Sequence, residues 1–288
     1  MDSVVLKSPA KINLVLDVVR KRLDGFHDVD LVLQEIDLHD VVTVRSVDSG
    51  ISIQCSRPDV PLNEKNLCYR AVQLVRKETG VSSGARIALQ KTIPPSSGLG
   101  GGSSNAVAVL KALNALWKLN VSPLQLMDWS SRLGSDCAFF VRGKTQRARG
   151  RGELLEALSP CPELHLVLAF PAISLNEKTA MVYRKLDVAS IPSHPSAEKM
   201  AIALQSKNPK SVADSAGNVF HYSKVHEYAP LMGKLAAWKQ SKLVWNALMC
   251  GAGPTLMAIC QSENSAKEFA DSLKADSFWK HVMVSKTA

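Results

Sequence analysis

The amino-acid sequence predicts an α+β protein built from two domains. Residues 4–19 and 26–47 alternate apolar and polar side chains, as half-buried β-strands do. Residues 85–116 show a strand pattern, then a glycine-rich loop, then a helix pattern. The SPCPE segment at residues 159–163 interrupts these patterns, and a new strand follows it directly. A chain of 288 residues can supply two ordinary cores, so we expect domains over 1–160 and 161–288.

The first strand, residues 4–19, carries five apolar side chains on one face: Ala10, Ile12, Leu14, Leu16 and Val18. A turn near residues 23–25 leads into the strand-rich stretch 26–47. After an irregular segment, the spacing predicts a helix over about residues 67–77. Gly80 is expected to end this helix, because glycine adopts the left-handed conformation that commonly follows a last helical turn.

The glycine-rich loop lies between the strand 85–93 and a helix that extends to residue 116. It contains Gly98, Gly100, Gly101 and Gly102. Glycines let a backbone turn tightly and approach a ligand, and Ser103 and Ser104 are expected to cap the helix. Free N–H groups at a helix N-terminus bind phosphate well, so phosphate binding is favoured over a plain glycine turn. The loop lacks the Gly-Lys-Ser/Thr of a Walker A motif and fits the dinucleotide fingerprint poorly.

The remaining elements follow in order. Ser122 and Pro123 open a helix that Gly134 closes, and Asp136 can cap a short turn after it. A strand pattern over 145–158 places Arg147, Arg149 and Arg151 on one face. In the second half we expect helices around 179–186, 197–204, 219–240 and 263–275, a strand–glycine turn–strand unit over 243–260, and strands over 163–170 and 278–285.

Composition excludes several classes of protein. No apolar run reaches the length of a membrane span, and the N-terminus lacks the apolar core of a signal peptide. The six cysteines are scattered without metal-binding spacing, which favours reduced thiols in the cytoplasm. The net charge of +9 favours an anionic ligand. Few aromatic residues and no nucleic-acid motif argue against nucleic acid as the main partner.

Individual polar residues have ordinary explanations as well as functional ones. Lys11 shares a strand face with Asn13, but most lysines on strands are simply solvated. Asp136 is as consistent with a helix-capping role as with a functional one. The face with the three arginines is consistent with a strand face exposed to solvent. The Gly251–Gly253 segment is consistent with a hairpin turn. Composition and spacing alone do not place these segments in one site.

Four motifs, in order, resemble those of the GHMP kinases, which include galactokinase, homoserine kinase and mevalonate kinase. The motifs are PAKINL, GLGGGSSNA, GSDCAFF and CGAGPTLMA. The DGFHDVD segment, the extra loop glycine and the FFVRG stretch are most similar to the 4-diphosphocytidyl-2-C-methyl-D-erythritol kinase branch. The resemblance implies an N-terminal domain like ribosomal protein S5 domain 2 and a ferredoxin-like C-terminal domain.

The resemblance also implies a reaction, in which ATP phosphorylates the 2-hydroxyl of the cytidylylated methylerythritol in the non-mevalonate isoprenoid pathway. Asp136 would be the catalytic base and Lys11 its cationic neighbour. The loop would bind ATP, with Mg²⁺ held through Ser103 or Ser104, and Asn66 and Lys91 near the base. The ATP-binding residues implied are Asn66, Lys91, Pro94, Gly98, Leu99, Gly100, Gly101, Gly102, Ser103 and Ser104.

The resemblance places substrate-binding roles on a further set of residues: Asn13, Phe26, His27, Thr179, Tyr183, Gly251 and Gly253. Phe26 and Tyr183 would stack on the cytosine, and His27 would hydrogen-bond it. The branch usually has Tyr at the first position, so Phe26 keeps the ring and loses a hydroxyl. Cys250 and Ala252 replace the usual Ser or Thr of the late motif, which leaves backbone contacts from its glycines.

Two alternatives remain open at this stage. One is a GHMP kinase for another small alcohol, such as mevalonate or homoserine, for which the Phe26–His27 pair would have no base to bind. The other is a nucleotide-binding or nucleic-acid-binding module without catalysis. We expect a small-molecule substrate, no nucleic-acid or membrane partner, and a cytoplasmic monomer or weak homodimer.

Overall fold

A computed structural model of the chain describes residues 2–173, 178–223 and 225–288. The chain forms two compact units that interleave in sequence. The first unit comprises Met1–Lys11, Leu38–Ser96 and Gly100–Gly143, and the second comprises Ile12–Asp37, Ser97–Leu99 and Lys144–Ala288. The domain division at residue 160 stays a prediction.

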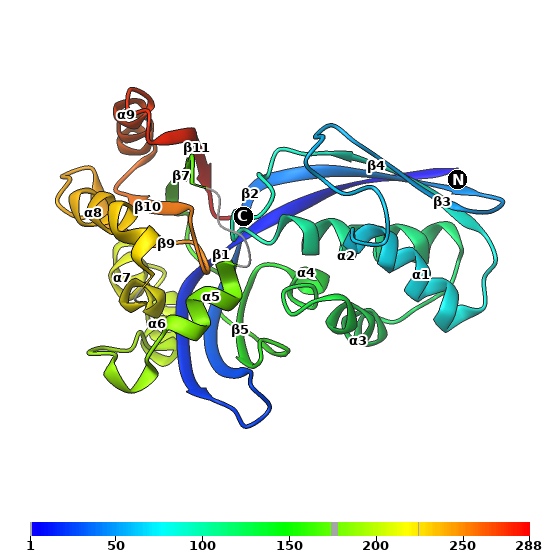
Figure 1. Ribbon diagram of the computed structural model, residues 1–288, viewed down its shortest axis with the longest axis horizontal. Coiled ribbons are helices and arrows are strands. Elements are labelled where there is room, and N and C mark those ends of the chain that lie inside the picture. The colour runs from blue at the N-terminus through cyan, green and yellow to red at the C-terminus, as the bar shows by residue number, and fades with distance from the viewer. Residues whose placement is uncertain (1, 174–177, 224) are drawn as a thin grey trace. The chain divides into compact units, whose positions relative to one another are not determined.

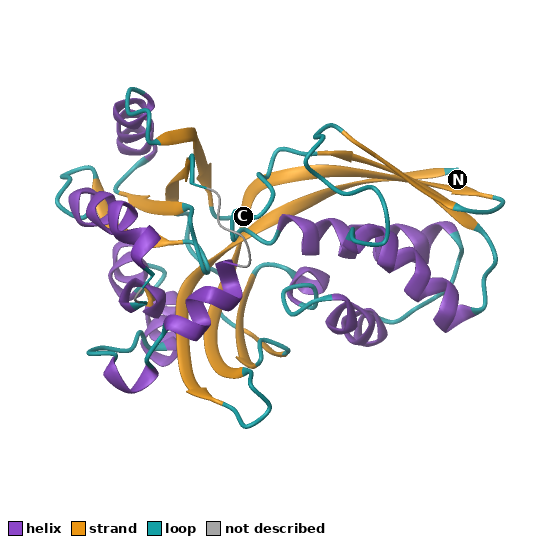
Figure 2. Cartoon of the chain, viewed as in Figure 1, coloured by secondary structure: helices purple, strands orange, loops and turns teal. Residues whose placement is uncertain are grey.

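The chain contains both helices and strands (Figure 1, Figure 2). The strands are β1 (Ser3–Lys21), β2 (His27–Val47), β3 (Ile51–Cys55), β4 (Gly84–Gln90), β5 (Thr145–Gly150), β6 (Leu154–Ala157), β7 (His165–Pro171), β8 (Gly217–Asn218), β9 (Val244–Met249), β10 (Leu256–Cys260) and β11 (Trp279–Lys286). The α-helices are α1 (Leu67–Thr79), α2 (Gly101–Leu116), α3 (Pro123–Leu133), α4 (Phe139–Arg142), α5 (Lys178–Lys185), α6 (Ala197–Gln205), α7 (Pro209–Ser215), α8 (Ala229–Trp238) and α9 (Glu263–Lys274). None of the helices described has the length and apolar character that a membrane span requires.

The first unit packs helices against one face of a sheet. Its strands follow the order β3-β4-β2-β1, with β3 parallel to β4 and β2 antiparallel to β4. Helices α1 and α2 run along the sheet (Figure 1). Val42, Val44 and Ile87 alternate with more exposed neighbours on β2 and β4 and are fully buried. The predicted alternation in these strands therefore corresponds to a sheet with one face in the core.

The first strand departs from the simple alternation expected. The predicted apolar face is buried, but Lys11 and Asn13, on the other face, are each only 4% exposed. An ammonium group with so little exposure needs polar partners. The strand therefore carries functional or structural polar groups into the interior.

Several predicted helix ends are confirmed. Asn66 caps α1 by accepting a hydrogen bond from the Cys68 N–H (2.9 Å), and Gly80 ends it with φ 73°. Ser122 caps α3 by accepting from the Gln125 N–H (3.2 Å).

The second unit contains a four-stranded sheet in the order β11-β7-β10-β9, in which all pairs are antiparallel. Within this unit β2 also pairs with β5, and β1 pairs with β8. The continuous helix predicted over 219–240 is wrong. The chain there forms 3₁₀ turns at Val219–Tyr222 and His226–Tyr228, and only then α8. Pro230 explains the late start, because proline lacks an N–H and fits the first turn of a helix.

Candidate functional site

The glycine loop passes directly into α2, as the sequence predicted, but its cap differs from the prediction. Gly100 is the N-cap, in the left-handed conformation (φ 73°), and no side chain caps the helix. The expected capping role of Ser103 and Ser104 is therefore wrong. Ser104 already lies within the helix, where its N–H donates to the Gly100 carbonyl (2.9 Å). Its hydroxyl is buried and accepts from Ser8 Oγ (2.8 Å).

Three of the four loop glycines are explained by packing alone. A Cβ on Gly98 would lie 2.4 Å from the Cys250 carbonyl oxygen. A Cβ on Gly100 would lie 2.9 Å from the Phe140 ring, and one on Gly101 would lie 3.0 Å from Ile93 Cγ2. Gly102 differs, because no described atom lies within 4 Å of its Cβ position. Packing therefore does not account for glycine at this first-turn position.

Lys11 and Asp136 form an ion pair next to this loop. Lys11 Nζ lies 3.7 Å from Asp136 Oδ2, and the two side chains are 5% and 41% exposed. The same lysine borders the loop, since its Cγ would lie 3.2 Å from a Cβ on Gly100. β1 supplies Lys11, and the turn between α3 and α4 supplies Asp136. The first unit thus brings together three motifs that the sequence could not connect by spacing.

The turn that carries Asp136 also contacts the start of α2. Burial raises the pKa of the neighbouring Cys137 thiol to about 12, while a hydrogen bond with Ser103 works in the opposite direction. The Ser103 side chain is half-buried, whereas Ser104 is 2% exposed. Ser103 is therefore the more accessible of the two hydroxyls.

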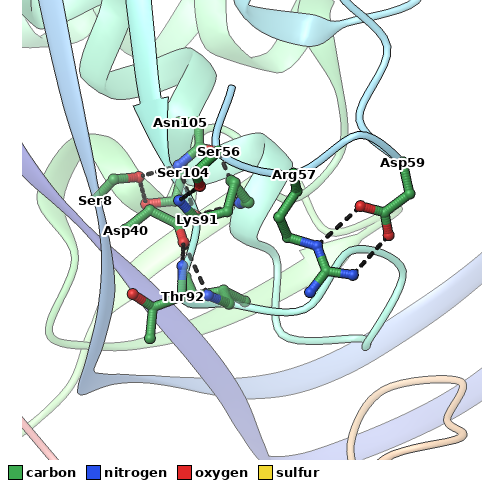
Figure 3. Close-up of polar contacts among 10 residues, drawn as sticks. Ser8, Asp40, Ser56, Arg57, Asp59, Lys91, Thr92, Ser104 and Asn105 are labelled. Atoms are coloured by element: carbon green, nitrogen blue, oxygen red, sulfur yellow. Dashed lines mark hydrogen bonds and ion pairs between the residues drawn. The ribbon is translucent and has the colours of Figure 1, made fainter. Parts of the chain in front are cut away.

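The two residues expected near the nucleotide base have structural partners. Asn66 caps α1 and donates from Nδ2 to the Pro61 carbonyl (2.7 Å). Lys91 Nζ contacts Asp40 and donates to Asn105 Oδ1 (2.9 Å), as Figure 3 shows. Elsewhere in the expected ATP-binding loop, Pro94 is half-buried and Leu99 is fully buried. Ser8, Asp40 and Asn105 share this network with Lys91, and no sequence motif indicated a role for them.

An aromatic cluster in the second unit contains the residues expected to bind cytosine. The His27 ring lies 4.9 Å from the Tyr183 ring, and Tyr183 packs edge-on against Phe220 at 4.8 Å. Burial, together with the charge of Lys21, lowers the pKa of His27. The side chain of Thr179, at the start of α5, lies outside the described residues. His27 and Tyr183 are therefore neighbours, as the expected role requires.

Phe26 is 49% exposed at the end of the turn that precedes β2. Its backbone N–H donates to Asp24 Oδ1 (3.1 Å), and the hydrogen bond of Asp24 with Arg22 lowers the pKa of Asp24. The Arg151 guanidinium lies over the Phe26 ring, 3.6 Å from its centre. Arg151 is an additional neighbour that the sequence analysis did not connect with Phe26.

The late glycine turn is held through its backbone. Asn218 Nδ2 donates to the carbonyls of Met249 (2.7 Å) and Gly251 (2.9 Å). The Tyr228 hydroxyl donates to the Ala252 carbonyl (2.7 Å). Asn13 Oδ1 lies 4.0 Å from the Cβ position of Gly251, so strand β1 passes beside this turn.

The continuous strand expected over 145–158 is wrong, because β5 ends at Gly150 and a turn that contains Arg151 precedes β6. The three arginines therefore do not share one strand face, and each has a separate partner. Arg147 forms two hydrogen bonds with Asp30 (2.8 and 2.6 Å) and a further one with Glu198 (2.5 Å). Arg149 pairs with Glu156 at 3.3 Å, and both side chains are exposed. With Arg151 over Phe26, the structure assigns each arginine a protein neighbour.

The described residues contain no cluster of three or more His, Cys, Asp or Glu side chains suited to holding a metal ion. A protein cage for a metal is therefore not formed by this part of the chain. Mg²⁺ commonly binds through one or two protein oxygens together with phosphates and waters. The accessible Ser103 hydroxyl fits that manner of binding.

Comparison with known proteins identifies similar proteins over nearly the whole chain, and they are of the kinase family that the sequence motifs resemble. The family model for the GHMP kinases N terminal domain matches residues 66–144, and that for GHMP kinases C terminal matches residues 200–277. The 4-diphosphocytidyl-2-C-methyl-D-erythritol kinase of Alkaliphilus metalliredigens (strain QYMF) is 39% identical, over 95% of this chain and 93% of the relative. The protein of the same name from Pelotomaculum thermopropionicum is 41% identical, over 91% and 90%.

A solved structure resembles the whole chain. The crystal structure of a 4-(cytidine 5'-diphospho)-2C-methyl-D-erythritol kinase superimposes with a TM-score of 0.82 and 30% identity, covering 99% of both chains. The mixed two-domain fold expected from the sequence motifs is therefore confirmed. The chain belongs to the GHMP kinase family.

Proposed function

We propose that this chain is an ATP-dependent kinase that phosphorylates the 2-hydroxyl of 4-diphosphocytidyl-2-C-methyl-D-erythritol, in the non-mevalonate route to isoprenoid precursors. The observation that carries the proposal is the Lys11–Asp136 pair beside the glycine loop and the N-terminus of α2. The similar proteins of that name, aligned over nearly the whole chain, support the choice of substrate.

Asp136 is the proposed catalytic base. An alcohol is a weak nucleophile at neutral pH, and a carboxylate within hydrogen-bonding reach can accept its proton as the phosphoryl group transfers. The Asp136 side chain is 41% exposed, so an acceptor hydroxyl can reach it. Lys11 is held in the interior beside it and is placed to offset negative charge on the phosphoryl oxygens.

The ATP phosphates are proposed to bind at the start of α2. The first-turn N–H groups of the helix have no partner within the helix, and the helix dipole favours an anion there. The open space beside Gly102 lets an anion approach this backbone. We propose that Ser103 contacts Mg²⁺, which shields phosphate charge when bound.

The cytidine end is proposed to bind in the second unit. Phe26 and Tyr183 supply rings for stacking, and His27 supplies a hydrogen-bonding edge to the cytosine. Asn13, Thr179 and the backbone of Gly251 and Gly253 are proposed to contact the diphosphate or the erythritol hydroxyls. We further propose a cytoplasmic monomer or weak homodimer without nucleic-acid or membrane partners.

The test is ADP release from ATP and Mg²⁺ with four acceptors: the cytidylylated methylerythritol, methylerythritol itself, mevalonate and homoserine. We expect turnover only with the cytidylylated acceptor, because it alone contains a cytosine ring that the Phe26–His27 pair can bind. Turnover with an acceptor that lacks cytidine would retain the kinase and reject this substrate. ATP binding without turnover of any acceptor would instead favour a non-catalytic nucleotide-binding protein.

A further inference from the structure

A buried carboxylate lies at the centre of a polar network beneath the glycine loop. Asp40, on β2, is 0% exposed. Asp40 Oδ1 accepts from the backbone N–H groups of Thr92 (2.7 Å) and Ile93 (2.9 Å). Asp40 Oδ2 accepts from Asn105 Nδ2 (2.9 Å) and from Lys91 Nζ. Figure 3 shows these groups pointing toward one another.

Lys91 is committed to this network. Its side chain is 4% exposed, and its ammonium donates to Asp40 and to Asn105 Oδ1. A buried ion is tolerated only when it is paired and hydrogen-bonded, and removing one member of a buried pair leaves the other uncompensated. Asp40 and Lys91 therefore depend on each other, unlike the exposed Arg57–Asp59 pair nearby.

The network joins three backbone segments of the proposed phosphoryl-transfer site in the first unit. The Thr92 and Ile93 amides begin the connection from β4 to the glycine loop. Asn105 lies in the first turns of α2 and donates to Ser8 Oγ (2.8 Å), which in turn donates to Ser104 Oγ. Ser8 precedes Lys11 by three residues on β1. Through these hydrogen bonds, Asp40 connects the loop, the N-terminus of α2 and strand β1, which carries Lys11.

We propose that Asp40 and Lys91 are positioning residues, which together hold the nucleotide loop, and that Lys91 acts through Asp40 rather than by binding the nucleotide with its ammonium. This inference rests on the proposed ATP site. Its physical basis is that positioning errors of about 1 Å, even from distant substitutions, can cost about 100-fold in rate. It revises the expectation that Lys91 contacts the nucleotide near its base.

The test is a double-variant cycle of Asp40→Asn and Lys91→Met, read out as the Kd for Mg²⁺-ATP by calorimetry and as the KM for ATP. In Asp40→Asn, the amide keeps an oxygen for the Thr92 and Ile93 N–H groups but turns donors toward the Lys91 ammonium. We expect ATP affinity to fall about 10- to 100-fold. In the double variant no buried charge remains, and the Asn105 amide can turn its oxygen toward the amide introduced at position 40.

The two possible roles of Lys91 predict different outcomes. If the pair is a positioning device, the double variant binds ATP better than either single variant, within about threefold of the wild type. If Lys91 binds the nucleotide directly, the double variant is no better than Lys91→Met, and the proposal is overturned. If a single variant fails to fold, the ATP affinity of the folded double variant is a sufficient test. A loss of about tenfold in the ATP affinity of the double variant would also overturn the proposal.

Asp37→Asn is the matched control. Asp37 lies on the same strand as Asp40 but accepts from Ser285 Oγ (2.5 Å) and the Lys286 N–H (3.0 Å), which belong to β11. It should leave ATP affinity unchanged. The direct ATP titration does not depend on the acceptor. Failure of the proposed substrate would therefore show in the turnover assay of the wild type, and failure of the pair in the cycle.

Discussion

Asp136 combines an exposed carboxylate with a buried cationic neighbour, which is the arrangement that a catalytic base needs. Replacing it by Asn keeps the shape and removes the ability to accept a proton. We expect Asp136→Asn to lower turnover about 10²- to 10⁴-fold, with ATP affinity nearly unchanged. Steady-state kinetics and ATP titration measure the two effects separately. A variant that retained near-normal turnover would remove Asp136 from this role.

Arg151 is the residue that the structure adds to the proposed cytidine site. Its guanidinium covers one face of Phe26, and an exposed cation–π contact contributes about 0.5–1 kcal/mol. We expect Arg151→Leu to raise the KM for the cytidylylated acceptor about two- to fivefold, without changing the KM for ATP. Arg149→Leu is the control, because Arg149 pairs with Glu156 instead. Equal effects of the two substitutions would contradict this role.

Local patterns predicted some residue roles and could not predict others. Lys11 and Asp136 were identified because their motifs resemble those of a known family, and the structure then placed them 3.7 Å apart. Asp40 escaped notice because its partners come from residues 8, 91–93 and 105, which are distant in sequence. An aspartate within a strand pattern is normally taken as solvated. Only the assembled sheet shows that it is buried.

At the scale of elements, the glycine loop offers a comparison between two substitutions. Gly102→Ala should leave thermal stability unchanged or slightly higher, because the Cβ meets no described atom within 4 Å and alanine favours helix. Its ATP affinity should fall, because the methyl group occupies the proposed approach to the helix N-terminus. Gly100→Ala should instead unfold at lower temperature, since the residue has φ +73° and its Cβ would lie 2.9 Å from Phe140.

Thermal melts with and without ATP separate the two variants. Stabilisation by ATP should be reduced in Gly102→Ala relative to the wild type, because a ligand that binds the folded state more tightly stabilises it more. Undiminished stabilisation by ATP in Gly102→Ala would show that the phosphates bind elsewhere.

Element ends were predicted where a side chain or a glycine marks them, and missed where packing decides. Gly80, Ser122 and Gly134 carry recognisable end signals, and the structure confirms that Gly80 ends α1 and that α3 lies between Ser122 and Gly134. The start of α2 was placed too late because Ser103 and Ser104 resemble caps. Ser104 instead turns inward to Ser8, a partner on another element. Such a choice depends on tertiary contacts that a local pattern does not contain.

At the scale of the whole molecule, buried titratable groups decide how stability varies with pH. His221 is the clearest case, since burial, assisted by the charge of Lys239, lowers its pKa to about 3. Its Nε2 accepts a hydrogen bond from the Met249 N–H (3.0 Å), which requires a neutral ring. Protonation would therefore remove an acceptor and place a charge in the interior.

The sign of the pH effect follows from proton binding in the two states. Between pH 6.5, the ordinary pKa of His, and about 3, the unfolded chain binds a proton at residue 221 and the folded chain does not. The free energy of unfolding should thus fall as the pH is lowered through this range, by about 1.4 kcal/mol per pH unit from this group. His221→Gln keeps an acceptor for the Met249 N–H and does not titrate. The free energy of unfolding of both proteins can be measured with urea in about one-unit steps, at pH 4.5, 5.5, 6.5 and 7.5. Below pH 6.5, each step should separate the two proteins by about 1.4 kcal/mol more. The variant should therefore lose stability less steeply than the wild type. If the free energies of unfolding of the two proteins fall in parallel with pH, His221 does not control acid stability. The carboxylates present in both the wild type and the variant would then account for the whole pH dependence.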